Sequence, residues 1–227
     1  MSLEALVPLV LLGALFGLDV VSFPQAMFSR PIVAATIAGA MVGRPESGLL
    51  AGAALELMAL ETLPFGASRY PEWGSASVVG GALFAMQPNG RAGALSLAIL
   101  GALATAWIGG GSMVALRRLN GRWARGKRDA ILAGEWSAVR NLMLGGIGAD
   151  LLRGAAITCA AMIAMVPIMH ATLGSWTIEP RLSRAVSVAV LAAVAAGACW
   201  KLFRSSPAAR WLFVGGVAAG LALLVFR

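Results

Sequence analysis

The sequence predicts an all-α membrane protein, a bundle of helices that cross a lipid bilayer within one domain covering residues 1–227. Three observations predict this fold class. First, 59% of the 227 residues are hydrophobic and only 12% are charged, whereas about a quarter of the residues in a soluble domain are charged. Second, several apolar stretches are long enough to cross a bilayer. Third, basic residues gather in one segment between two such stretches, as expected for a cytoplasmic loop.

Four apolar stretches approach or exceed the roughly 20 residues that a transmembrane helix needs. A fifth stretch is shorter, but it contains no charged residue. The first stretch lacks a basic leading region and a small-residue cleavage site, so we expect a retained span and not a signal peptide. The five stretches are Leu3–Val21, Ala92–Leu116, Gly145–Met169, Ala185–Phe203 and Trp211–Phe226.

The region from residue 31 to residue 90 has a different pattern. Its apolar segments, Ile32–Val42, Gly48–Leu63 and Ser75–Gln87, are short and are separated by sequences rich in proline and glycine. Such segments predict broken or re-entrant helices, whose free backbone groups survive at membrane depth only where protein covers them or a cavity adjoins them. The pattern therefore indicates a solute pathway. A loop-rich membrane fold without a pathway is the alternative.

Glycines within this region are spaced for close helix packing. Gly39 and Gly43 are four residues apart, as are Gly48 and Gly52, and residues at this spacing share a helix face. Glycine there lets two backbones approach closely. Glu56 continues the stripe after Gly52, so its carboxylate is predicted to enter a close helix interface. A buried carboxylate is costly unless it is paired or functional, and both interpretations of Glu56 stay open.

Other polar residues near membrane depth are candidates for the same pathway. Glu61 lies about 140° around the helix from Glu56, and Glu72 follows Pro71 in a broken segment. Gln25 and Arg30 precede the first short helix. Two further features have simpler expected roles: an ion pair three residues apart within one helix for Asp150 and Arg153, and a position at the membrane interface for Asp19.

The segment 117–145 is predicted to be a basic cytoplasmic connector. Six of the eighteen basic residues of the chain lie near its start, which fits the positive-inside rule, and no basic face with interleaved aromatics suggests nucleic-acid binding. Apolar residues between Ile131 and Met143 fall within an arc of about 140°. They predict a helix on the membrane surface or on a partner, with a plain connecting helix as the alternative. The six basic residues are Arg117, Arg118, Arg122, Arg125, Lys127 and Arg128.

No catalytic, cofactor or metal site is predicted. His170 is the single histidine, and its place at the end of an apolar segment favours a structural role. Cys159 and Cys199 lie in apolar stretches without metal-type spacing. Phosphate-binding loops, nucleophile elbows and zinc-protease motifs do not occur in the sequence. The chain is therefore expected not to be an enzyme by itself.

Residues 1–90 resemble the opening of the IIC subunit of mannose/fructose/sorbose-type phosphotransferase systems. The resemblance consists of Leu18-Asp19, Pro24-Gln25 and the run from Ser29 to Val33, followed by the spaced glycines that lead into Glu56-Leu57, and then Pro64, Gly66 and Pro71. Three positions depart from the usual pattern. Arg44 stands where aspartate is usual, Glu72 replaces an aspartate, and Glu61 stands where a small residue is commoner.

The resemblance implies a permease subunit of the bacterial inner membrane that binds and conducts a hexose-like sugar. It implies an oligomeric complex with a IID membrane subunit, served by soluble IIA and IIB components that relay phosphate. The expected sugar contacts are Glu56, Gln25, Glu72, Glu61 and Arg30. A degenerate IIC-like component with a docking or regulatory role and an unrelated small-solute permease remain alternatives, and the sugar itself is not predicted.

Overall fold

The computed structural model describes residues 3–19, 22–61, 69–88, 91–206 and 208–225. Its regular elements in these ranges are helices, which confirms the all-α class. In chain order they are α1 (Leu3–Asp19), α2 (Pro31–Met41), α3 (Pro45–Glu61), α4 (Trp73–Ala85), α5 (Ala94–Gly126), α6 (Arg128–Leu132), α7 (Trp136–Gly174), α8 (Pro180–Phe203) and α9 (Ala209–Val225).

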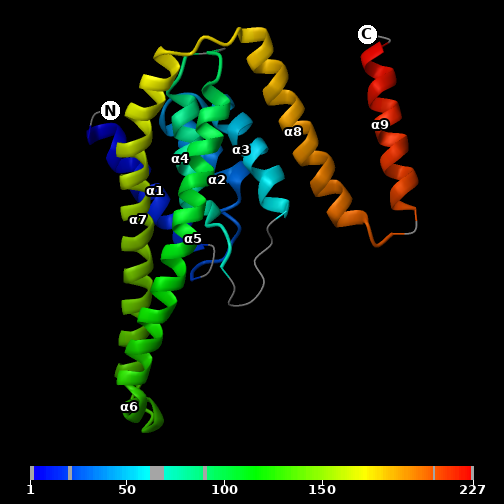
Figure 1. The fold of residues 1–227 in the computed structure, drawn as a ribbon. Coiled ribbons are helices and arrows are strands. Elements are labelled where there is room, and N and C mark those ends of the chain that lie inside the picture. The colour runs from blue at the N-terminus through cyan, green and yellow to red at the C-terminus, as the bar shows by residue number, and fades with distance from the viewer. Residues whose placement is uncertain (1–2, 20–21, 62–68, 89–90, 207, 226–227) are drawn as a thin grey trace.

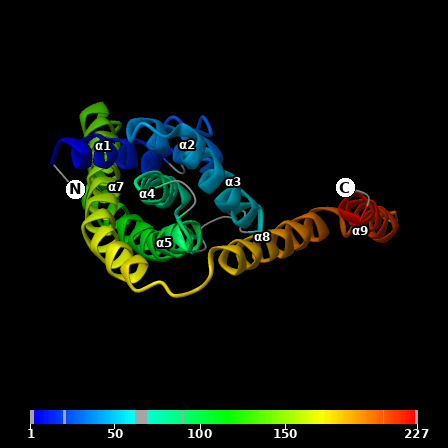
Figure 2. The same ribbon diagram turned by 90° about the horizontal axis from the view of Figure 1, so that it is seen from above.

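Helix α4 lies at the centre of the bundle, with α1, α2, α3, α5 and α7 around it (Figure 2). Its sequence explains this place, because glycine, alanine and serine form much of the helix and let neighbours approach closely. Within α4 only Trp73 and Phe84 are not fully buried. The main apolar core packs α4 against α1, α2, α5 and α7 through residues such as Leu9, Val79 and Met162.

Helices α5 and α7 form a long antiparallel pair that extends past the other helices to α6 (Figure 1). They contain 33 and 39 residues, or about 50 and 58 Å at the usual helical rise. In the described part of the chain, α5, α7 and residues Pro180–Lys201 of α8 are long and apolar enough to cross a membrane. The spans predicted at Ala92–Leu116, Gly145–Met169 and Ala185–Phe203 lie within or largely overlap these helices.

The region 31–87 folds into three separate short helices. α2, α3 and α4 contain 11, 17 and 13 residues, so each is shorter than the roughly 30 Å hydrocarbon layer at the usual helical rise. The predicted breaker Pro64-Phe65-Gly66 lies outside the described residues. Short helices are therefore observed, while their re-entrant course through the membrane stays a prediction.

The prediction of one amphipathic helix between Ile131 and Met143 is wrong. Ile131 belongs to the short helix α6, whereas Trp136 begins α7, whose first turns are collinear with its apolar part. Gly134 between them has φ +77°, a left-handed conformation that ends helices and that glycine adopts without steric cost. The segment 117–145 is consequently not a loop, because it continues α5, turns through α6 and enters α7.

Helices α8 and α9 form an arm that extends away from the bundle (Figures 1 and 2). Their exposed surface is strongly apolar, with Val188, Trp211 and Leu223 among the exposed side chains. An apolar helix that is exposed over most of its circumference is expected to face lipid or another membrane helix. The arm thus supports the membrane assignment.

Candidate functional site

The glycine stripe allows α2 and α3 to pack backbone against backbone. A Cβ atom added to Gly48 would lie 2.3 Å from the carbonyl oxygen of Ala35, and one added to Gly52 would lie 2.8 Å from that of Pro31. A Cβ on Gly39 would lie 2.7 Å from the Cα of Gly48. No side chain fits in these gaps, so glycine is required for the observed separation. The predicted close helix interface is confirmed.

This packing places Glu56 against the first turn of α2. Glu56 lies one turn beyond Gly52, and its carboxylate accepts a hydrogen bond from the guanidinium of Arg30 and another, 3.2 Å long, from the backbone N–H of Ile32. The free N–H groups at the start of a helix attract negative charge. Pro31 suits the first helical position, because the backbone N–H that proline lacks would have no partner within the helix there.

The Arg30–Glu56 pair is partly buried. The side chains are 34% and 16% exposed, respectively, so part of each lies at the surface of the described structure. Arginine offers only donors and glutamate only acceptors. A pair of this kind can bind two neighbouring hydroxyl groups, with Glu56 as the acceptor and Arg30 as the donor.

The loop of residues 22–30, which leads into α2, carries both Arg30 and Gln25. Gln25 is exposed, and it has φ 57°, while Met27 has φ 64°, values that side-chain-bearing residues seldom adopt. Asp19 holds this conformation, because its carboxylate accepts the backbone N–H groups of Ala26 at 2.7 Å and Ser29 at 2.9 Å. Asp19 itself is only 2% exposed, so it holds the loop from inside the protein, and its depth in the membrane stays a prediction.

A second polar cluster anchors the other end of this loop in the bundle. The hydroxyl of Ser22 donates to Asp150 of α7, and the guanidinium of Arg153 donates to the same carboxylate at 2.8 Å. The predicted ion pair is therefore present. Arg153 also donates to the carbonyl of Gly17 at 3.2 Å and to the hydroxyl of Ser112 at 3.3 Å. One buried arginine thus joins α7 to α1 and α5.

Glu72 belongs to this second cluster and not to the Arg30–Glu56 pair. It is fully buried and caps α4, where its Oε1 accepts the backbone N–H of Ser75 at 3.0 Å. Its Oε2 has no hydrogen-bond partner among the described residues and lies 4.0 Å from Nη1 of Arg153. Helix α5 comes close because Gly109 has no side chain: a Cβ there would lie 2.9 Å from that of Glu72.

Of the five predicted sugar contacts, the structure brings two into direct contact and places a third in the adjoining loop. Arg30 and Glu56 are paired, and Gln25 lies five residues before Arg30. Glu72 is enclosed elsewhere. Glu61 is the last residue of α3, and its side chain lies outside the described residues, so its role stays a prediction.

Sequence reasoning missed the residues that brace the loop. Asp19, Asp150 and Arg153 were assigned an interfacial place and a local ion pair, yet they connect α1, α7 and the loop of residues 22–30. A signal was present in the sequence, because Asp19 and Asp150 each adjoin long apolar runs, where a charge is costly unless it has partners. The identity of those partners depends on helices that are far apart in the chain.

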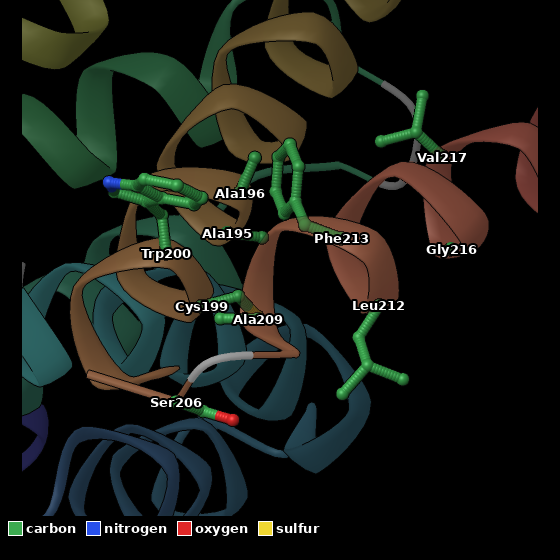
Figure 3. Close-up of a pocket in the computed structure, with 10 residues that line it drawn as sticks. All are labelled: Ala195, Ala196, Cys199, Trp200, Ser206, Ala209, Leu212, Phe213, Gly216 and Val217. Carbon is green, nitrogen blue, oxygen red and sulfur yellow. The ribbon is translucent and has the colours of Figure 1, made fainter. Parts of the chain in front are cut away.

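A groove between α8 and α9 is unsuited to a sugar. It has a volume of about 470 Å³ and is lined mainly by alanine, leucine, valine and aromatic side chains, among them Trp200 and Phe213 (Figure 3). These two rings meet edge to face with centroids 5.9 Å apart. A neutral polyol needs several polar partners, and this lining supplies few. The groove is an apolar surface, of the kind expected to face lipid or another membrane helix.

Substituting Gly48 by alanine should destabilise the protein by about 1–3 kcal/mol, the usual cost of overpacking. The added methyl group would meet the Ala35 carbonyl at 2.3 Å and push α2 from α3, which should also separate Glu56 from Arg30. Thermal unfolding of the purified protein in detergent measures the effect. Gly215→Ala is the matched control, because nothing lies within 4 Å of a Cβ there. Equal stability of the two variants would refute the packing role.

Comparison with known proteins agrees with this architecture. Residues 4–221 match the family described as PTS system sorbose-specific IIC component. A solved structure described as "Structure of membrane protein" aligns with a TM-score of 0.73 at 19% identity, covering 100% of this chain and 92% of the other. A cryo-EM structure of the mannose transporter ManYZ with microcin E492 aligns with a TM-score of 0.62 at 19% identity, covering 97% and 87%.

No curated protein matches the sequence. At 19% identity the two solved structures establish the shared fold. The family match spans almost the whole chain and includes the glycine stripe, the braced loop and the Arg30–Glu56 pair. This chain belongs to the family of sorbose-specific IIC components of the phosphotransferase system.

Proposed function

We propose that this protein is the sugar-conducting IIC subunit of a phosphoenolpyruvate-dependent phosphotransferase system of the mannose type. The observation that carries the proposal is the partly exposed Arg30–Glu56 pair, held at the start of α2 by the close glycine packing of α2 and α3 in a chain of the IIC family. The protein acts in the inner membrane of a bacterium, in an oligomeric complex with a IID membrane subunit. Soluble IIA and IIB components supply phosphate.

In this proposal Arg30 and Glu56 bind neighbouring hydroxyl groups of a hexose-like sugar. Gln25 has an amide that can both donate and accept, and its loop adjoins Arg30, so it contributes a further contact. Glu61, the last residue of the helix that carries Glu56, is a further proposed contact. Glu72 has a structural role in this proposal and does not contact the sugar, because it caps α4 and is fully buried. The chain itself performs no phosphate chemistry.

Arg44 departs from the family pattern without disturbing the site. Its guanidinium donates to the backbone carbonyl of Gln87, which ties the turn between α2 and α3 to the end of α4. A positive charge at this position is therefore accommodated by a local acceptor. Arg44 therefore changes how the α2–α3 turn is held and leaves the Arg30–Glu56 pair in place. This favours a working permease over a degenerate docking component.

Sugar uptake tests the proposed function. Cells that lack the gene should lose uptake of the hexose substrate, and the gene restored from a plasmid should return it. The purified complex with its IID subunit should bind that sugar in a calorimetric titration over a panel of hexoses and related sugars. Unchanged uptake in the deletion strain, together with no binding to the purified complex, would favour the degenerate or regulatory alternative.

A further inference from the structure

The end of the α5–α7 pair is a projecting surface that the sugar pathway does not use. We define the hairpin tip as residues 118–144, which comprise the last turns of α5, α6 and the first turns of α7. It extends beyond the rest of the bundle (Figure 1). The tip has six basic and two acidic residues, a net charge of +4. Its basic side chains are all exposed; they are Arg118, Arg122, Arg125, Lys127, Arg128 and Arg140.

Large apolar side chains are exposed among these charges. Leu132 is 74% exposed and Trp136 69% exposed, and both belong to the tip. Trp136, Val139 and Met143 are spaced three and four residues apart, so they form one stripe along the start of α7. All three are exposed. A contiguous apolar stripe with a polar rim is the usual composition of an interaction surface.

Lipid does not reach this stripe when α5 crosses the membrane. The apolar part of α5, Ala94–Leu116, is about 34 Å long and fills the hydrocarbon layer by itself. From Arg117 to the end of α5 at Gly126 the helix extends about 14 Å further, whereas the headgroup region adds only about 5–8 Å on each side. The tip therefore stands in water, where a stripe of large exposed apolar side chains rimmed by polar residues marks a site for another protein.

We infer that the hairpin tip is the docking surface for a soluble protein with an anionic face around an apolar centre. Charge complementarity selects this occupant, because the rim of the stripe carries an excess of arginine and lysine. The identity of the occupant rests on the proposed function: it is the phosphate-carrying soluble component, whose phosphoryl group adds negative charge. The basic rim attracts the carrier and the apolar stripe holds it. The positive-inside rule places both on the cytoplasmic side.

Binding of the soluble IIB component tests the inference. The complex of this chain with its IID subunit is placed in nanodiscs of zwitterionic lipid, and purified IIB of the same system is titrated at several salt concentrations. The double variant Arg122→Glu and Arg125→Glu should bind at least about tenfold more weakly and show less dependence on salt. Trp136→Ala should bind about fivefold or more weakly, mainly through faster dissociation.

Matched controls keep charge and size effects apart. Arg91→Glu reverses an exposed arginine next to the start of α5, at the opposite end from α6, and Trp211→Ala removes an exposed tryptophan on α9. Both controls should bind IIB as the unchanged chain does. Sugar binding by the tip variants should also be unchanged, because Arg30 and Glu56 lie elsewhere. Weakened docking with intact sugar binding supports the inference.

Four outcomes would overturn it. These are equal IIB affinity of the tip variants and the unchanged chain, absence of IIB binding to the unchanged complex, and labelling of Arg125→Cys in intact cells by a membrane-impermeant thiol reagent. The fourth concerns a spin label attached to the variant Trp136→Cys. If oxygen reaches the label but a water-soluble nickel chelate does not, the stripe lies in lipid. Absence of sugar binding by the unchanged complex would instead contradict the proposed function. The IIB titration would still test the docking surface, because it does not depend on sugar.

Discussion

Replacing Glu56 by glutamine should weaken sugar binding by about 1–3 kcal/mol, the scale for losing a charged hydrogen-bond partner. Glutamine keeps the size of the side chain and one acceptor, so it can still accept the backbone N–H of Ile32. It loses the charge that pairs with Arg30. Because the side chain is only 16% exposed, little water competes with the sugar for that charge. Calorimetric titration of the purified complex measures the change.

Glu46→Gln is the matched control for this experiment. Glu46 lies on the same helix as Glu56 but in its first turn, where it is exposed, and its substitution should leave sugar affinity unchanged. If Glu56→Gln assembles with the IID subunit and binds sugar like the unchanged chain, Glu56 is only a structural carboxylate. If the variant instead fails to insert or assemble, the main role of Glu56 is to hold α3 against α2.

Replacing Arg153 by methionine should reduce stability by about 3–5 kcal/mol, the cost of leaving a buried charge without its partner. Arg153 lies in the bundle with 7% of its side chain exposed. Methionine fills a similar volume but leaves Asp150 and Glu72 without their shared cation, and it removes the bonds to Gly17 and Ser112. Thermal unfolding in detergent and the yield of assembled complex measure the loss.

Two further variants separate the causes. Arg153→Lys keeps the charge but lacks the planar fork that reaches several acceptors at once, so its loss should be intermediate. Arg184→Met removes an exposed arginine on α8 and should leave stability nearly unchanged. A stability of Arg153→Met within about 1 kcal/mol of the unchanged chain would show that the cluster contributes little, as many exposed ion pairs do.

Local patterns were sufficient for most of the helices and for one half of the candidate site. The apolar stretches predicted α1, α5, α7, α8 and α9, because lipid imposes a minimum length on any crossing helix. The stripe of Gly48 and Gly52 predicted a close approach of α3 to another helix, since spacing within one helix determines which residues share a face. Glu56 follows on that face, and the structure places it in that interface beside Arg30.

Helix ends near the hairpin tip were predicted less well. The sequence of residues 131–143 has helical periodicity, but periodicity does not record where a helix is interrupted. The left-handed turn at Gly134 separates α6 from α7. Arg117–Gly126 was interpreted as part of a polar loop because the segment is charged, whereas arginine, leucine and alanine also favour helix and continue α5.

The sequence by itself determined that this is a helical membrane protein with short helices between residues 31 and 87, a close helix contact at the stripe of Gly48 and Gly52, and a basic segment before α7. These properties depend on composition and on spacings of a few residues. Tertiary structure alone decided that Asp19 braces the loop of residues 22–30, that Asp150 and Arg153 anchor it, and that Glu72 caps α4 inside the bundle. A buried charge must find a partner, but which distant helix supplies that partner depends on how the helices pack around α4.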